Sequence, residues 1–263
     1  MKRTLLSQPP EGFPQALEPW IEGAPIYDSS CSREARVYYI EKEEGLFLKS
    51  APPGDLEREA LLNAYFHSLG LGPEVLLYQK ETDREYLLTR RVPGEDCTHR
   101  MYRDQPERLC DTTATLLRAL HETPAADCPV PDRNASYRRR VEEGFGGAYF
   151  EADLFKDIWE FASYAEAEQA AREGFSVMKT DALLHGDYCL PNIILQDWKF
   201  SGYIDLGNGG LGDRHIDILW GVWTLNYNLK TTRYTERFLD AYGRDVVELE
   251  KLRTLAAMEM IGG

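Results

Sequence analysis

The pattern of apolar and polar positions predicts two β-hairpins and one helix in the first part of the chain. Apolar runs at residues 36–40 and 45–49 are joined by charged residues, and a second pair of runs lies at 75–78 and 85–89. Short apolar runs separated by polar turns are typical of hairpin strands. Between the two pairs, apolar residues recur at helical spacing from about residue 55 to residue 68. This part of the chain is therefore expected to be rich in β-strands.

Beyond residue 106 the pattern becomes mainly helical. An apolar stripe runs to His121, and a second apolar helix is predicted over residues 213–223. Between these helices, residues 193–195 and 200–204 are apolar runs typical of two short strands. The second part of the chain is therefore expected to be larger and mainly helical.

A break between the two patterns predicts a two-lobed α+β fold. Residues 92–96 lie between them and are expected to form a linker. We therefore predict a small β-rich lobe with one helix over residues 1–93 and a larger helical lobe over residues 94–263. Ligands often bind between domains, so a cleft between the lobes is the expected place for a site.

The most informative motif lies in the predicted helical lobe. Residues 185–192 read His-Gly-Asp-Tyr-Cys-Leu-Pro-Asn, and Asp205-Leu-Gly follows thirteen residues after Asn192. This order and spacing are typical of a kinase catalytic loop and its metal-binding aspartate. Asp187 is the candidate base, which would orient a hydroxyl and accept its proton. Asn192 and Asp205 are the candidate Mg²⁺ ligands.

The predicted β-rich lobe offers a cation and an acid that suit the same chemistry. Lys49 closes the second strand, and Glu59 lies on the helix that follows. Kinases use such a pair to place a positive charge on the nucleotide phosphates. Glu57 is an alternative partner, but Glu59 comes just before an apolar run and is nearer the inward face. The alternative interpretation is that Lys49 and Glu59 are ordinary surface side chains that do not interact.

Two weaker nucleotide-binding candidates lie near the first strand. The turn at residues 28–32 contains no glycine, but the hydroxyls of Ser30 and Ser32 could cover phosphates. A plain turn is an equally good interpretation. Tyr38 could present an aromatic face to adenine, or it could belong to the ordinary core of the lobe.

Other titratable residues near the motif fit structural roles better than catalytic ones. His185 is expected to bond to nearby backbone, and His121 ends a helix, where its interaction with the helix dipole is favourable. Asp213 is predicted to cap the helix that follows it. Asp217, on that helix, is predicted to brace the catalytic loop. The histidines lack the spacing of a metal-hydrolase site.

Composition excludes several classes of partner. The net charge of −14 over 263 residues argues against binding to nucleic acid or to an anionic membrane, and it suits a small cationic substrate. No apolar run approaches the roughly 18 residues that cross a bilayer, and the first residues do not resemble a secretory signal. The 5 scattered cysteines lack metal or redox spacing. We therefore expect a cytoplasmic protein with reduced thiols, present as a monomer or a weak dimer.

With these residues in view, the chain resembles the aminoglycoside phosphotransferases, in particular the 3′-phosphotransferase branch that acts on kanamycin and neomycin. The segments that carry the resemblance are residues 185–192, 200–207 and 212–218, and more weakly 92–94. The resemblance implies a protein-kinase-like fold and Mg²⁺-assisted transfer of phosphate from ATP or GTP to an aminoglycoside hydroxyl.

The resemblance also implies roles for single residues on the nucleotide side. Asp187 would be the base, with Asn192 and Asp205 as the Mg²⁺ ligands, and Lys49 with Glu59 would hold the phosphates. Tyr38 would stack on adenine, and Arg91 and Val92 would lie near the hinge whose backbone pairs with the base.

On the acceptor side the chain departs from the family pattern. The positions of the usual acidic pair on the late helix hold Tyr227 and Asn228. Of the acidic and aromatic C-terminus only Glu259 matches, and Asp157 and Glu160 match an acidic insertion loosely. These five residues are the candidates for substrate binding.

Two other functions compete with aminoglycoside phosphorylation. A related kinase could act on another small hydroxylated substrate, such as a different antibiotic, an amino alcohol or a sugar, and the missing acidic pair favours this alternative. A catalytically silent nucleotide-binding pseudokinase is less favoured, because every residue of the core motif is present.

Overall fold

The computed structural model describes residues 3–10, 12–30, 35–147, 149–156 and 158–262. Contacts divide the chain into two compact units. Unit 1 contains residues 1–93 and 201–207, and unit 2 contains residues 94–200 and 208–263. The return of residues 201–207 to unit 1 was not predicted, and it carries Asp205 into the β-rich unit.

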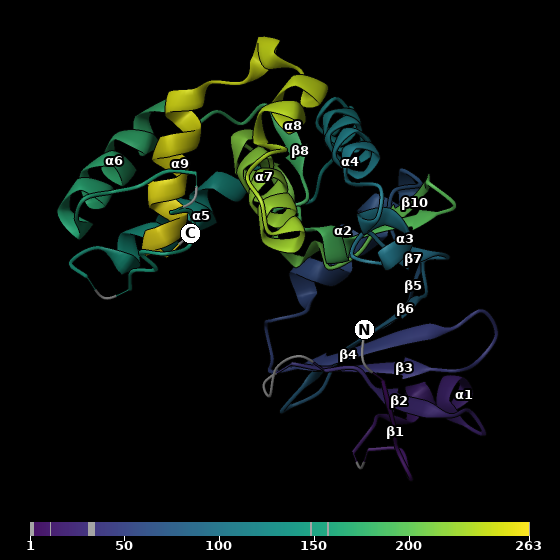
Figure 1. Cartoon of the computed structure of the whole chain (residues 1–263). Helices are drawn as coiled ribbons and strands as arrows, with labels where there is room; N and C mark the ends of the chain where they lie inside the picture. The colour runs from purple at the N-terminus through teal and green to yellow at the C-terminus, as the bar shows by residue number, and fades with distance from the viewer. Residues whose placement is uncertain (1–2, 11, 31–34, 148, 157, 263) are drawn as a thin grey trace. The chain divides into compact units, whose positions relative to one another are not determined.

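Unit 1 is built on an antiparallel sheet of six strands (Figure 1). In spatial order they are β1 (Thr4–Leu5), β2 (Ile26–Asp28), β3 (Arg36–Ile40), β4 (Leu46–Ala51), β6 (Glu85–Arg90) and β5 (Val75–Lys80). A short helix α1 (Glu18–Ile21) precedes β2, and α2 (Glu57–Ser68) connects β4 to β5. Both predicted hairpins and the predicted helix are therefore confirmed.

The two faces of this sheet bury different apolar clusters, because side chains alternate along each strand. The larger cluster contains Leu17, Ile26, Tyr38, Ile40, Leu46, Leu48, Tyr86 and Leu88. The smaller cluster contains Leu87 with Ala51, Leu56 and Ala60 from β4 and the start of α2. In register, Tyr38 pairs with Leu48 and Val37 pairs with Lys49. Lys49 therefore points to the face opposite Tyr38, the face that Leu87 shares.

Unit 2 is mainly helical. Its helices are α3 (Arg100–Arg103), α4 (Pro106–His121), α5 (Arg133–Gly144), α6 (Tyr164–Val177), α7 (His215–Leu229), α8 (Thr235–Tyr242) and α9 (Leu249–Ile261). Helices α6 and α9 pack side by side, and α4 packs on α8 (Figure 1). Local sequence signals fix several helix ends. At α6, for example, Ser163 Oγ accepts from the Glu166 backbone N–H, and Glu166 Oε2 accepts from the Ala162 backbone N–H.

Short strands position the motif residues. β8 (Ala182–Leu184) pairs with β11 (Gly210–Gly212), and β9 (Ile193–Gln196) pairs with β7 (Glu95–Asp96) and β10 (Lys199–Tyr203). Asp197 and Trp198 join β9 to β10 with φ values of 50° and 67°. Two successive left-handed residues are the geometry of a tight hairpin turn. The catalytic-loop motif thus follows β8 and leads directly into β9.

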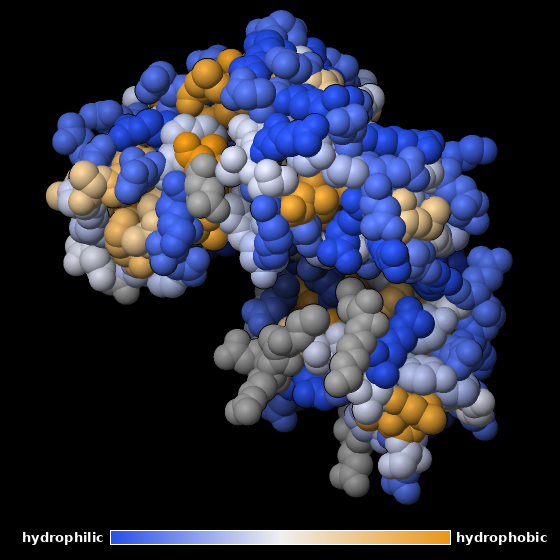
Figure 2. All heavy atoms as spheres, viewed as in Figure 1, coloured by the Kyte–Doolittle hydropathy of each residue, from blue (hydrophilic) through white to orange (hydrophobic). Residues whose placement is uncertain are grey.

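The surface is dominated by polar side chains, with small apolar patches, in the view of Figure 2. Among the described residues, no helix has both the length and the apolar character needed to cross a membrane.

Candidate active site

Lys49, Glu59 and Asp205 meet within unit 1. The Nζ of Lys49 lies 2.6 Å from Glu59 Oε1 and 2.8 Å from Asp205 Oδ1. Lys49 comes from β4, Glu59 from the first turns of α2, and Asp205 from the segment after β10. Glu57 instead pairs with Lys80, 2.5 Å away. The structure therefore forms the Lys49–Glu59 pair that the helical pattern favoured.

The two carboxylates keep Lys49 charged. Burial alone would lower the pKa of its ammonium group, but Glu59 and Asp205 outweigh burial and raise that pKa above its ordinary value. Asp205 also adopts an unusual backbone conformation, with φ of 62°. Non-glycine residues in this left-handed region cluster at functional sites, where the surroundings hold them in place.

Tyr38 does not lie on the face of the sheet that carries Lys49. Its side chain is 7% exposed and belongs to the larger apolar cluster, where Phe13 contacts it edge-on at 5.4 Å. The prediction that Tyr38 stacks on adenine is therefore wrong, because the strand register turns its ring to the opposite face. Phe47, two residues before Lys49 on the same strand, is an aromatic side chain on the Lys49 face that sequence reasoning missed. Strict alternation back from Lys49 would have found it.

The remaining nucleotide-side candidates have ordinary structural contacts. Ser30 Oγ accepts from the backbone N–H of Val37 at 2.9 Å, which fastens the turn to β3. The Arg91 backbone N–H donates to Gly45 O at 2.9 Å, and Val92 lies beside Gly202. All of these contacts are within unit 1, whereas Ser32 lies outside the described residues.

Asp187 and Asn192 form a second cluster, within unit 2. Asn192 Nδ2 donates to both Asp187 Oδ2 at 2.9 Å and Asp187 O at 3.0 Å. A short 3-10 turn over residues Leu190–Asn192 makes this possible, and the Leu190 N–H donates to Thr224 Oγ1 of α7 at 3.0 Å. Asn192 is thus held by its side-chain nitrogen, and its amide oxygen lies on the other side of the amide group.

The backbone before Asp187 is anchored by a buried carboxylate. Asp217, on α7, accepts from His185 N at 2.7 Å and from Gly186 N at 2.8 Å. His121 Nε2 lies 3.3 Å from the same carboxylate and Tyr242 Oη lies 2.8 Å from His121 Nδ1. Burial lowers the pKa of His121, which favours a neutral ring. The predicted brace by Asp217 is confirmed.

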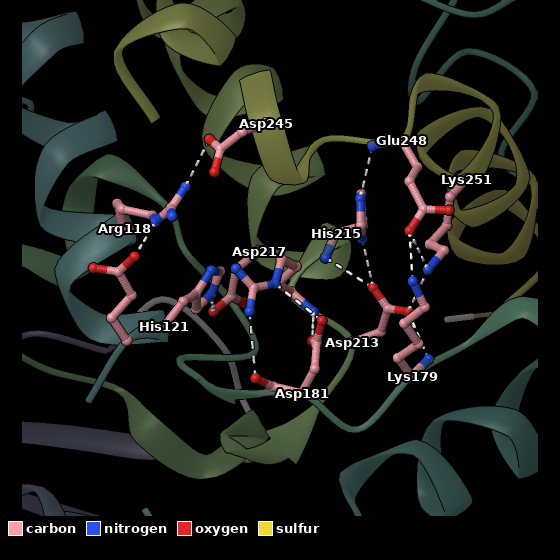
Figure 3. A network of polar contacts seen from close by, with 12 residues as sticks. Arg118, His121, Lys179, Asp181, Asp213, His215, Asp217, Asp245, Glu248 and Lys251 are labelled. Atoms are coloured by element: carbon pink, nitrogen blue, oxygen red, sulfur yellow. Dashed lines mark hydrogen bonds and ion pairs between the residues drawn. The ribbon is translucent and has the colours of Figure 1, made fainter. Parts of the chain in front are cut away.

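A second polar network surrounds Asp213, at the start of α7 (Figure 3). Asp213 Oδ1 accepts from the His215 backbone N at 3.0 Å, although the helix itself begins at His215. The Nδ1 atom of the His215 ring lies 2.7 Å from the same Asp213 Oδ1. Lys251 Nζ of α9 lies 3.3 Å from Asp213 Oδ2. The backbone N–H of Lys179 donates to Asp213 Oδ2 at 2.7 Å. Asp213 therefore ties three segments of unit 2 together. It is not the N-cap of α7 as predicted, because that position is Arg214 and Asp213 lies one residue before it.

The pKa of Asp213 links this network to acid stability. Burial would raise that pKa, but the hydrogen bond and charge of His215 outweigh it and lower the pKa from 3.8 to about 2. A depressed carboxyl pKa contributes stability above the unfolded value, and that contribution is lost as the pH falls from about 4 towards 2. We expect this group to contribute about 2 kcal/mol to the unfolding free energy at pH 5, of which roughly 1 kcal/mol is lost by pH 3, as measured by urea unfolding at the two pH values.

Asp213→Asn provides the comparison. The variant is expected to be less stable than the wild type at pH 5, and the difference should narrow towards pH 2.5. An unchanged difference across this range would show that Asp213 does not titrate as its contacts require.

The acceptor-side candidates are dispersed in unit 2. Tyr227 is 56% exposed and stacks on Trp223 at 4.9 Å, while Asn228 Nδ2 donates to Thr224 O at 2.8 Å. Glu160 is exposed, and Asp157 lies outside the described residues. Glu259 is only 5% exposed, and burial raises the pKa of its carboxyl group. Its side chain therefore lies inside the helical unit rather than on its surface.

The two candidate metal ligands suit a hard cation. Asn192 offers an amide oxygen and Asp205 a carboxylate, which is 54% exposed. Mg²⁺ prefers such oxygen donors and commonly completes its coordination with nucleotide phosphates and water. The donor chemistry of these residues therefore fits Mg²⁺.

The β-rich unit with its Lys–Glu–Asp cluster and the helical unit with its Asp–Asn loop define a phosphotransferase of the protein-kinase-like class. The family model described as "Phosphotransferase enzyme family" matches residues 32–255. The chain belongs to this family, and within it to the aminoglycoside 3′-phosphotransferase branch. A probable aminoglycoside 3′-phosphotransferase of Lactococcus lactis is 42% identical over 96% of each chain.

Solved structures agree with this assignment. The crystal structure of an aminoglycoside 3′-phosphotransferase of type VIII has a TM-score of 0.69 and 25% identity, covering 94% of this chain and 96% of its own. An aminoglycoside phosphotransferase from Streptomyces rimosus, solved with ADP and streptomycin, has a TM-score of 0.65 and 21% identity, covering 86% and 90%. The likeness to the Streptomyces rimosus structure supports the fold alone. That fold is the predicted protein-kinase-like fold.

Proposed function

We propose that this protein transfers the γ-phosphoryl group of ATP or GTP to the 3′ hydroxyl of an aminoglycoside, with Asp187 as the base. The observation that carries the proposal is the Asp187–Asn192 cluster, whose backbone is braced by Asp217. Phosphoryl transfer depends mainly on positioning and charge neutralisation, and this loop supplies a fixed carboxylate. The relationship to aminoglycoside 3′-phosphotransferases supports the choice of acceptor.

In the proposed reaction Asp187 orients the acceptor hydroxyl and takes its proton as the new O–P bond forms. The bond between the γ-phosphorus and the β–γ bridging oxygen breaks in the same step, and ADP or GDP leaves. Asn192 holds one oxygen of the carboxylate through Nδ2, which fixes the rotation of the side chain. The neighbouring Cys189 does not compete as a nucleophile, since burial and the charge of Asp187 raise the pKa of its thiol.

On the nucleotide side Lys49 neutralises phosphate charge, and Glu59 fixes the direction of its ammonium group. Phe47 shares the sheet face of Lys49 and offers an apolar surface to the base. Mg²⁺, when bound, supplies charge neutralisation at the phosphate oxygens. Asn192 and Asp205 are the residues that would hold it.

A second acceptor class is favoured by the side chains near Thr224. Where a cationic substrate would meet carboxylates, Tyr227 stacks on Trp223, and Lys230 Nζ lies 4.1 Å above the Tyr227 ring. An ammonium group already occupies this aromatic face, so a less cationic hydroxylated acceptor would also fit.

Turnover on a defined panel tests both acceptors. Purified protein is incubated with ATP or GTP, Mg²⁺ and kanamycin, neomycin, choline or simple sugars, and each product is located by ³¹P NMR and mass spectrometry. Phosphorylation of an aminoglycoside at the 3′ position, absent in Asp187→Ala, is the expected result. Turnover of another acceptor alone would favour the second class. Nucleotide binding without any turnover would indicate a pseudokinase.

The reaction also bears on compartment and assembly. Nucleoside triphosphates are cytoplasmic substrates, so we propose a cytoplasmic location, with neither nucleic acid nor a membrane as a partner. Each proposed group comes from one chain, and a monomer or weak dimer is therefore sufficient for activity.

A further inference from the structure

Arg133, the first residue of α5, contacts the catalytic loop from a buried position, where a charged side chain has a large desolvation cost. Its side chain is buried, with 2% of the residue exposed. Nε donates to Asn208 O at 3.1 Å and Nη2 donates to Gly186 O at 3.4 Å. Gly186 immediately precedes Asp187, and Asn208 immediately follows the Asp-Leu-Gly motif. One guanidinium group therefore joins the two backbone segments that flank the motif residues.

These two segments are already in close contact. Gly186 has φ of 83°, and a Cβ at this position would lie 1.9 Å from Asn208 O. Gly186 is thus needed both for its backbone conformation and for the approach of Asn208. Arg133 binds the carbonyl groups of both residues at this crossing.

The peptide groups around Gly186 are held from two sides by buried charges. The Gly186 N–H donates to the carboxylate of Asp217, and the Gly186 carbonyl accepts from the guanidinium of Arg133. Hydrogen bonds to charged groups are roughly twice as strong as neutral ones. The backbone that leads into Asp187 is therefore fixed at both its donor and its acceptor.

Stability does not explain a charged residue at this position. A cation in the first turn of a helix opposes the helix dipole, and a buried guanidinium carries a large desolvation cost. In the described part of the chain, Arg133 Nη1 is buried without a hydrogen-bond partner. The ring of Tyr137 lies 4.7 Å from the Arg133 guanidinium carbon. Residues that break several stability rules at once are expected at functional sites.

We propose that Arg133 is a positioning residue for phosphoryl transfer, which sets the placement of Asp187 by holding the Gly186 and Asn208 carbonyl groups together. Burial lowers the pKa of the Arg133 guanidinium, and the charge of Glu259 on α9 opposes that effect in part. This gives the buried Glu259 a role inside unit 2, in support of the loop. The proposal rests on the proposed phosphotransferase activity.

Arg133→Lys is the most informative variant, because it keeps the charge but cannot present two fixed donors to two carbonyl groups. We expect kcat to fall about tenfold, with the KM values for nucleotide and acceptor changed less than twofold. Arg133→Met should lower kcat about a hundredfold. Arg139→Met, an exposed arginine on the same helix, is the matched control and should retain wild-type kcat.

Hydrogen exchange gives a readout that needs no acceptor. The amides of His185 and Gly186 are expected to exchange at least about tenfold faster in Arg133→Lys than in the wild type, because the loop can open when one carbonyl is released. Wild-type kcat in Arg133→Lys, a rise in KM alone, or unchanged exchange would each overturn the proposal. If the wild type phosphorylates no aminoglycoside, the proposed function fails, while the exchange rates still decide the role of Arg133.

Discussion

Asp187→Asn is expected to lower kcat by about 10²–10⁴-fold at saturating nucleotide and acceptor. The substitution removes the proton acceptor but keeps the shape of the side chain. An amide oxygen at this position can still accept the bond from Asn192 Nδ2, so the loop should keep its conformation. The loss should therefore appear in kcat, with nucleotide affinity and the unfolding midpoint close to those of the wild type.

Asp127→Asn is the matched control, since Asp127 is an exposed carboxylate in the same unit. It should leave both kcat and KM unchanged. Steady-state kinetics with a coupled nucleotide assay, together with urea unfolding of each variant, separates a chemical defect from a folding defect. A loss smaller than tenfold in Asp187→Asn would place the base elsewhere.

Local patterns were enough to predict the parts of the site that lie close together in sequence. The Asp187–Asn192 spacing spans a single loop, and one short turn brings the two side chains together. Glu59 was preferred to Glu57 because helical periodicity turns it towards the apolar side. The structure agrees, with Glu59 buried and Glu57 on the surface.

The error at Tyr38 shows where local patterns fail. Alternation along β3 places Tyr38 on the opposite face from Val37 and Tyr39. It does not say which of these two faces carries Lys49 of β4. That depends on the register between β3 and β4, in which Tyr38 pairs with Leu48. A shift of one residue exchanges the two faces. Phe47 avoids this uncertainty, because it lies on the same strand as Lys49.

Contacts between distant segments could not be predicted at all. Arg133 and Gly186 are 53 positions apart, and nothing in either local sequence indicates their hydrogen bond. The same holds for the contact between His121 and Asp217, since helix packing decides it. Glu259 was expected to meet substrate because of its place near the C-terminus, but its carboxylate is buried within unit 2. Buried charge networks depend on tertiary structure, which a single sequence does not display.

Lys49→Met is expected to lower kcat/KM for the nucleotide by at least about a hundredfold. The variant keeps much of the side-chain length but removes the ammonium group that pairs with both Glu59 and Asp205. Two carboxylates would then face the phosphates without a cation between them, so both nucleotide binding and turnover should suffer. Kinetics with varied nucleotide, and direct binding by calorimetry, measure the two effects separately.

Lys80→Met is the control for Lys49→Met. It tests whether the loss of any lysine that pairs with a carboxylate of α2 is enough to reduce activity. Lys80 also pairs with a carboxylate from α2, at 2.5 Å, but both side chains are about half exposed. The exposed Glu57 pair contributes roughly 0–1 kcal/mol and is screened by salt. Lys80 Nζ also lies 3.5 Å from the buried carboxylate of Glu85, so this variant should lose some stability. It should retain wild-type kinetics, because neither carboxylate belongs to the Lys49 cluster. If both variants lose activity equally, the defect comes from the sheet rather than from the phosphate site. If Lys49→Met keeps kcat/KM within threefold of the wild type, Lys49 does not bind the phosphates.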